Sequence, residues 1–229
     1  MTGPSTPGAL VAIDIGTSGA RASAFDLAGA PLGEVRRSYP TELPGEGLAE
    51  QDAGRWRSAA LSALTGLVRE LKPGIAAIGL TGQCPSVVPL DTELRPLRPG
   101  IIYRDNRATA EAGQIRERFG DAKLHALTGH LPAAFHVAAK ILWIRAHEPG
   151  VFAATRLFAQ PSDYVGLALT GEVGTDWSTA AATALLDLRE RTWAAELING
   201  LDLDQKTLPP VKPSWTVIEI GRASCRDRV

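Results

Sequence analysis

The residue types best suited to chemistry stand together near the start of the chain, in the run Asp14-Ile15-Gly16-Thr17-Ser18-Gly19. Asp14 closes an apolar stretch that reads as a buried strand, and the Gly/Thr/Ser turn follows it. Such a carboxylate can hold Mg²⁺, usually through water, while backbone N–H groups and hydroxyls of the turn face phosphate oxygens. Phosphoryl transfer needs this pairing because it consists mostly of positioning and charge neutralisation. Short Asp-x-Gly runs also occur in ordinary hairpin turns, so the motif alone leaves both interpretations open.

The elements around this motif must place it at the junction of two strands. Residues 9–15, 21–26 and 32–39 read as three consecutive antiparallel strands joined by Gly- or Pro-containing turns. A helix is expected to begin after Asp52, an N-cap type of residue, and to end before Pro73. Because a further short apolar strand follows it, the predicted order is βββαβ.

The rest of the chain reads as helices with short extended pieces between them. Apolar periodicity and Pro/Gly boundaries predict strands at residues 87–90 and 101–102 and helices at residues 105–119, 135–147, 162–169 and 193–199. Trp143 and Trp193 stand at positions typical of a helical core. Pro149 is expected to close the second of these helices. The whole pattern indicates an α/β protein.

Composition excludes several classes of protein. The chain has 229 residues, 45% of them hydrophobic and 21% charged, which is typical of a globular protein with a core and not of a disordered one. A net charge of -1 gives no basic field for nucleic acid. No apolar run reaches the ~20 residues of a membrane span, and no signal peptide is visible. Two distant cysteines and four histidines without metal spacing suggest neither a disulfide framework nor a zinc site, so we expect a cytoplasmic protein.

Several segments match, in the same order, motifs of the FGGY carbohydrate kinases, and the chain most resembles their xylulokinase-like branch. The matching segments are Ile13–Ser18, Glu50–Asp52, Ile78–Gln83, Leu97–Arg107, Thr128–Gly129, Lys140–Trp143, Asp163–Tyr164, Leu169–Glu172 and Thr175–Ser178. Their shared order, from about Leu10 to about Pro213, argues against chance. The resemblance implies a ribonuclease-H-like domain of the actin-like ATPase class, with a mixed sheet and flanking helices, over residues 9–218 after a flexible start at 1–8.

The resemblance also implies roles for residues at matched positions. Asp14 is expected to be catalytic and to bind Mg²⁺, and ATP is the expected phosphoryl donor. The residues expected to hold its phosphates are Gly16, Thr17, Ser18 and Arg21. The residues expected to contact a sugar or polyol are Gln83, Cys84, Tyr103 and Asp105. Without the family match, Gln83 reads equally well as a turn-capping amide and Asp105 as the N-cap of the next helix.

The chain departs from the family pattern directly after Gln83. Relatives often continue with Met-His-Gly or with Arg-Glu, whereas this chain has Cys84-Pro85-Ser86. A thiol and a proline cannot make the same polar contacts, so the sugar can differ from xylulose. Asp163 and Asp176 recur in the family, but we expect them to cap and pack and not to catalyse.

The resemblance describes only part of a kinase. In the family, the general base is an Asp in a downstream Gly-rich segment, and a second actin-like domain builds most of the adenosine pocket; neither is recognisable here. Residues 219–229 closely resemble the translation of a sequencing adapter, so we expect a non-native tail. The chain alone is therefore expected to show no kinase turnover.

The expected whole protein is an ATP-dependent carbohydrate kinase acting on a ketopentose or related polyol. Its partners would be that small molecule and ATP, with no nucleic acid and no membrane, and a homodimer is compatible with the sequence. Two alternatives stay open: another actin-like ATPase, and a non-catalytic module that senses or binds sugars.

Overall fold

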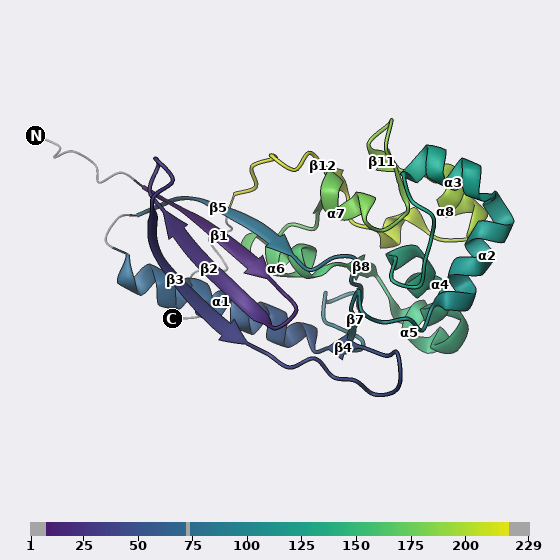
Figure 1. Cartoon of the computed structure of the whole chain (residues 1–229), viewed down its shortest axis with the longest axis horizontal. Coiled ribbons are helices and arrows are strands. Elements are labelled where there is room, and N and C mark those ends of the chain that lie inside the picture. The colour runs from purple at the N-terminus through teal and green to yellow at the C-terminus, as the bar shows by residue number, and fades with distance from the viewer. Residues whose placement is uncertain (1–7, 72–73, 220–229) are drawn as a thin grey trace, which may run out of the picture. The chain divides into compact units, whose positions relative to one another are not determined.

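The computed structural model describes residues 8–71 and 74–219. The chain forms two compact units, and each is assembled from two stretches of sequence (Figure 1). Unit 1 consists of Met1–Thr41 and Gly54–Gln83, and unit 2 consists of Glu42–Ala53 and Cys84–Val229. The expected flexible start and non-native tail fall on residues 1–7 and 220–229, apart from Gly8 and Glu219, and so lie outside the described residues.

Unit 1 contains a mixed four-stranded sheet with the strand order β3-β2-β1-β5. Its strands are β1 (Ala9–Ile15), β2 (Gly19–Phe25), β3 (Pro31–Ser38) and β5 (Ile75–Gly82). The first three strands form an antiparallel meander, and β5 pairs with β1 in parallel. The predicted βββαβ order and mixed sheet are confirmed.

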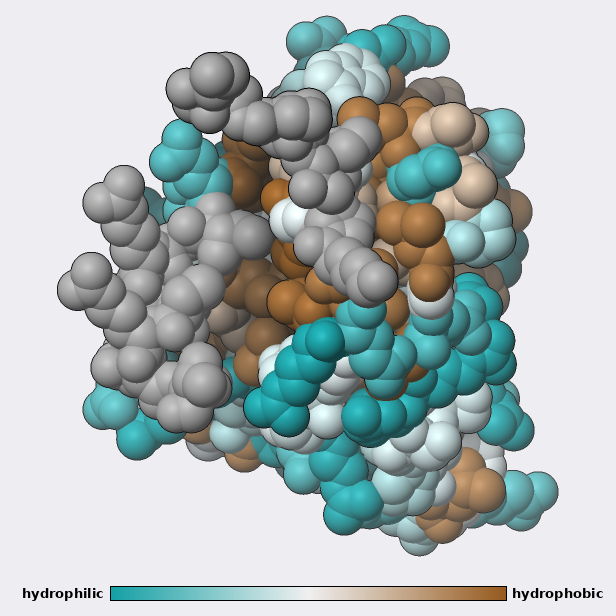
Figure 2. Space-filling model, turned by 90° about the vertical axis from the view of Figure 1, so that its left-hand side faces the viewer, coloured by the Kyte–Doolittle hydropathy of each residue, from teal (hydrophilic) through white to brown (hydrophobic). Residues whose placement is uncertain are grey.

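Helix α1 (Ala53–Glu70) covers one face of this sheet (Figure 1). Side chains alternate along β1, so Val11, Ile13 and Ile15 are buried while Leu10 is 40% exposed. The buried face of α1 is formed by Trp56, Ala60, Ala63 and Leu67. The opposite face of the sheet is open, since Leu10 and Ala12 of β1 are exposed on it. Seen from the side that is left in Figure 1, the molecule shows hydrophobic surface (Figure 2).

Unit 2 is mainly helical, with short two-stranded sheets. Its helices are α2 (Thr109–Phe119), α3 (Asp121–Thr128), α4 (Val137–His147), α5 (Pro149–Ala154), α6 (Pro161–Thr170), α7 (Trp177–Ala181), α8 (Ala195–Gly200) and the 3-10 helix η1 (Gln205–Thr207). Its strand pairs are β4 (Glu50–Gln51) with β7 (Gly100–Ile101), β6 (Val88–Leu90) with β8 (Leu157–Ala159), β10 (Leu186–Asp187) with β11 (Thr192–Trp193), and β12 (Val211–Lys212) with β9 (Thr175–Asp176).

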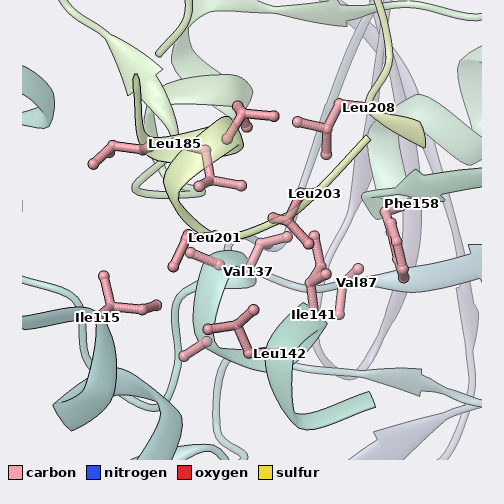
Figure 3. Packing of buried hydrophobic residues seen from close by; sticks show 14 of the residues in the cluster. Val87, Ile115, Val137, Ile141, Leu142, Phe158, Leu185, Leu201, Leu203 and Leu208 are labelled. Atoms are coloured by element: carbon pink, nitrogen blue, oxygen red, sulfur yellow. The ribbon is translucent and has the colours of Figure 1, made fainter. Parts of the chain in front are cut away.

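The core of unit 2 forms around α4, where seven of eleven residues are buried. Figure 3 shows Val137, Ile141 and Leu142 of this helix among side chains from distant parts of the sequence. These include Ile115 of α2 and Phe158 of β8, both nearly inaccessible. A helix that is apolar on almost all sides is expected at the centre of a helical core.

Two expectations about these elements were wrong, and the one for Pro149 was confirmed. The helix expected from Asp105 begins at Thr109, because the Asp105 side chain accepts hydrogen bonds in a preceding turn. Pro149 does close α4 but is also the first residue of α5, where a missing N–H costs nothing. Trp193 is in the core but lies on a strand, β11, with its Nε1 donating to Pro209 O at 2.8 Å.

Gly19 gives a test of how the first turn packs on β3. A Cβ at this position would lie 2.5 Å from Arg37 O and 2.9 Å from Ser38 Cα, both backbone atoms that cannot swing away. We expect Gly19→Ala to lower the free energy of unfolding by about 1–3 kcal/mol, measured by denaturant titration. The control Gly113→Ala, in α2, meets nothing within 4 Å and should be neutral or stabilising by up to about 1 kcal/mol. Equal midpoints for the two variants would contradict the packing.

Candidate functional site

Asp14 lies near the end of β1, on the open face of the sheet. Its neighbours Ile13 and Ile15 are buried, so the alternation of the strand directs the carboxylate away from α1. Across the sheet it is paired with Arg21 on β2 and with Thr81 on β5. Its side chain is 40% exposed, and it forms a long ion pair of 3.4 Å with Arg21 Nη2. The carboxylate is therefore accessible to a ligand.

The turn after Asp14 is held by Tyr39, a residue for which the sequence predicts no role beyond ending a strand. Tyr39 is nearly buried; its hydroxyl donates to Gly16 O at 2.6 Å, and its N–H donates to Ser18 O at 3.2 Å. Gly16 N donates to Gly19 O at 3.0 Å, which closes the turn. Burial, with a smaller contribution from the charge of Asp14, raises the pKa of Tyr39 above its usual range, so the hydroxyl stays a donor. The sequence contained a signal for this contact, because Tyr39 is an aromatic residue at the end of the strand that lies against the turn.

Asp14 borders a hollow of about 390 Å³ on the sheet of unit 1. The hollow is lined by Ala12, Asp14, Arg21, Ser23, Phe25, Glu34 and Thr81. Glu34 Oε2 lies 3.8 Å from Arg21 Nη1 and accepts from Ser23 Oγ at 3.0 Å, and hydrogen bonds from Arg36 and Ser23 lower the pKa of its carboxyl. Arg21 thus stands between two carboxylates at the edge of the hollow.

These residues fit a magnesium–phosphate group better than a metal held by protein alone. Among the described residues, no three His, Cys, Asp or Glu side chains gather in a way that could hold a metal ion. Mg²⁺ commonly binds one or two carboxylates and takes its other ligands from water and phosphates. Asp14 supplies such a carboxylate beside the glycine turn, and Arg21 supplies a cation for phosphate oxygens.

The residues expected to contact sugar differ in exposure. Cys84 is a free, exposed cysteine, and Tyr103 is 39% exposed, so both can meet a ligand. Asp105 has no exposed surface. Gln83, the last residue of unit 1, is partly buried, and its N–H donates to Ile15 O at 2.8 Å.

Both Asp105 oxygens accept hydrogen bonds from within the chain. Ala49 N donates to Oδ2 at 2.6 Å, and Arg107 donates through its backbone N and Nε to Oδ1 and through Nη2 to Oδ2 at 2.8–2.9 Å. Burial alone would raise the pKa of Asp105, but these hydrogen bonds hold it below its usual range. The N-cap alternative was wrong, because Ala108 precedes α2. A direct sugar contact stays a prediction, and it would require these bonds to be exchanged.

The remaining polar residues have structural roles in agreement with expectation. Asp163 accepts from Gln160 N at the start of α6, and Asp176 accepts from Ser178 N and Thr179 N at the start of α7. Burial raises the pKa of Asp163 to about 7. His136 is buried, and its Nδ1 accepts from Ala133 N at 3.0 Å.

Comparison with known proteins identifies the family. The pattern of the FGGY family of carbohydrate kinases, N-terminal domain, matches residues 9–225. This chain belongs to that family. It is 32% identical over 222 residues to the xylulose kinase of Lactococcus lactis, which covers 96% of this chain and 44% of the relative. It is 29% identical over 218 residues to the glycerol kinase of Gloeobacter violaceus, covering 94% and 44%.

Solved structures agree with this assignment. The crystal structure of a "xyloylose kinase" from Brucella ovis superposes with a TM-score of 0.82 at 34% identity, over 88% of this chain and 42% of that one. The expected fold, an α/β domain with a mixed sheet and flanking helices like that of FGGY kinases, is confirmed. The chain spans less than half the length of the relatives it matches. No helix within the described residues is long and apolar enough to cross a membrane.

Asp105 gives a test of the buried network. Asp105→Asn would remove one of the two carboxylates that pair with the buried Arg107 guanidinium and leave Glu50 at 2.7 Å, so we expect a loss of about 1–3 kcal/mol in the free energy of unfolding. Denaturant titration at neutral pH measures it. The control Asp202→Asn, at an exposed carboxylate whose ion pair is 4.0 Å long, should change stability by no more than about 0.5 kcal/mol. Similar losses in both variants would contradict the network's role.

Proposed function

We propose that the full-length protein is an ATP-dependent kinase that phosphorylates a primary hydroxyl of a ketopentose or a related polyol. The observation that carries the proposal is the accessible Asp14 carboxylate beside the glycine turn, at the edge of a hollow that holds one arginine. Kinship with xylulose and glycerol kinases supports the choice of substrate class.

Three features of unit 1 would contact the phosphates of ATP. Asp14 would hold Mg²⁺, which supplies positive charge to the phosphates when bound. Arg21 would donate to phosphate oxygens, since its contacts with Asp14 and Glu34 are long, solvent-exposed pairs that exchange at little cost. In the turn from Gly16 to Ser18, Tyr39 holds two carbonyl groups and Gly19 O holds the Gly16 N–H, so the turn is braced and its Thr17 and Ser18 hydroxyls would line the phosphates.

At the sugar end, Gln83, Cys84 and Tyr103 would contact the substrate. The Gln83 amide can both donate to and accept from a hydroxyl, and the exposed Tyr103 ring can pack on the carbon skeleton. Cys84 offers only a weak donor and the Pro85 side chain none, where many relatives carry Met-His or Arg-Glu. We infer that the part of the preferred sugar facing these residues carries no hydroxyl, or presents a C–H group to them.

The family pattern places the general base and most of the adenosine pocket in the part of the kinase that follows this region. We therefore propose that the chain alone releases no ADP in a sugar-dependent manner. Closure of a second domain would exclude water, so that ATP is not simply hydrolysed. Localisation in the cytoplasm belongs to the same proposal.

The test is a coupled assay of ADP release by the full-length protein with ketopentoses, glycerol, gluconate and deoxy sugars. We expect release that depends on one class of polyol and on Mg²⁺. Asp14→Asn should lower kcat at least a hundredfold, because a charged ligand to the metal–phosphate group is lost. The control is Asp26→Asn, since an Asn oxygen can accept the same turn hydrogen bonds from Ala28 N and Ala30 N; its kcat should be unchanged.

Two results would contradict the proposal. ATP turnover without any polyol dependence would indicate another kind of actin-like ATPase. Sugar binding without turnover in the full-length protein would indicate a sensing module.

A further inference from the structure

Helix α4 carries a fully buried ammonium group at its centre. Lys140 is 0% exposed, and its neighbours on the helix are apolar. Its Nζ donates to Pro85 O at 3.0 Å and to Ile102 O at 2.9 Å, with Ile101 O at 3.5 Å. The three donors of an ammonium thus meet three backbone carbonyls from two segments that are distant in the sequence.

The carbonyls that Lys140 binds stand next to residues proposed to contact sugar. Pro85 follows Cys84, and Ile102 precedes Tyr103. Both Cys84 and Tyr103 are exposed, whereas the carbonyl oxygens behind them are tied to α4. One side chain therefore fixes the backbone from which two exposed candidate ligands project.

Gln160, the residue that caps α6, holds the same segment from a second side. It is 2% exposed; its Oε1 accepts from Ser86 N at 3.3 Å, and its Nε2 donates to Thr179 O at 2.7 Å. Pro85 has no N–H of its own. Here the side chains of Lys140 and Gln160, and not a neighbouring strand, bind the polar backbone atoms of Pro85 and Ser86. Strand-like pairing resumes at Val87, which exchanges two hydrogen bonds with Ile101.

We propose that Lys140 is a positioning residue for sugar binding: it clamps Cys84–Ser86 to Ile101–Tyr103, so that the Cys84 and Tyr103 side chains are held in place before the sugar arrives. The proposal rests on the proposed function, because it needs these segments to form the sugar site. Preorganisation lowers the entropy lost on binding, and small displacements of contact groups weaken it strongly.

Charge explains why the clamp is a lysine and not an amide. Removing an ammonium from water is costly unless all its protons are bound and a negative charge lies nearby. Burial is the largest influence and lowers the Lys140 pKa to about 7, while Asp105 favours the charged form and Arg107 opposes it. The same carboxylate that binds Arg107 thus also favours the charged form of Lys140.

The experiment compares Lys140→Met with the wild type in the full-length protein. Methionine keeps the length and apolar contacts of the stem but removes every donor. We expect the KM for the sugar to rise at least tenfold while the KM for ATP stays within twofold. Amide hydrogen exchange should become faster in residues 84–86 and 101–105. The control Lys123→Met removes an exposed lysine that pairs with Glu196, and should leave both KM values and the exchange unchanged.

These readouts separate positioning from stability. A residue that only stabilises the fold would reduce the amount of active enzyme, and hence the apparent kcat, without changing the KM for sugar. If Lys140→Met cannot be recovered folded, Gln160→Met is the decisive variant, because it removes the hydrogen bond to Ser86 N without removing a charge. The expected result for it is the same rise in the KM for sugar.

Three outcomes would overturn the proposal. Faster exchange in residues 84–86 with an unchanged KM for sugar would show a structural clamp that binding does not use. Unchanged exchange would show that Lys140 does not hold the segments. A wild type without polyol-dependent ADP release would overturn the proposed function, and the positioning role with it, before any variant is considered.

Discussion

A buried ion pair between Asp105 and Arg107 organises much of unit 2. Arg107 also lies 2.7 Å from Glu50 on β4 and 4.8 Å above the ring of Trp143 on α4, while Asp105 accepts from Ala49 N. Arg98 extends the network, with contacts of 2.5 Å to Glu50 and 2.8 Å to Glu148. Because buried charges are tolerated only when they are paired and hydrogen-bonded, this network reinforces the short pairing of β4 with β7 and joins Glu148 to it.

The network and the Lys140 clamp have a common physical logic. Unit 2 has many short elements, and two-residue strands supply few backbone hydrogen bonds of their own. Long polar side chains, among them Lys140 and Gln160, therefore satisfy loop carbonyls and N–H groups from within an apolar core. Such contacts are directional, whereas apolar packing is not, and so they determine where the exposed Cys84 and Tyr103 stand.

Unit 1 relies on a simpler constraint. A sheet with α1 on one face must bury every second side chain of β1, and this alternation alone places Asp14 on the open face. A shift of one residue in the register would bury the carboxylate. The hollow beside Asp14 and the turn braced by Tyr39 are consequences of that register.

The sequence by itself determined the family, the order of strands and helices in unit 1, and the place of Asp14 in a turn at the strand end. These features depend on local periodicity, turn residues and short motifs, which a linear pattern contains. The extent of α1, α4 and α6 followed in the same way, to within two residues at each end. Capping by Asp163 and Asp176 was also readable, because an N-cap is a contact within one turn of helix.

Only the tertiary structure decided which polar residues are buried and what they bind. Asp105 reads as a ligand or a cap, yet it is enclosed by Ala49 and Arg107, one of them distant in the sequence. Lys140 reads as a polar residue on an apolar helix, yet its partners lie 38 to 55 positions away. The short strands β8 to β12 and the helices α3, α5 and α7 were missed, because a few residues carry no periodicity and take their conformation from their neighbours. Long-range partners are set by packing, and that information is not contained in any local stretch of sequence.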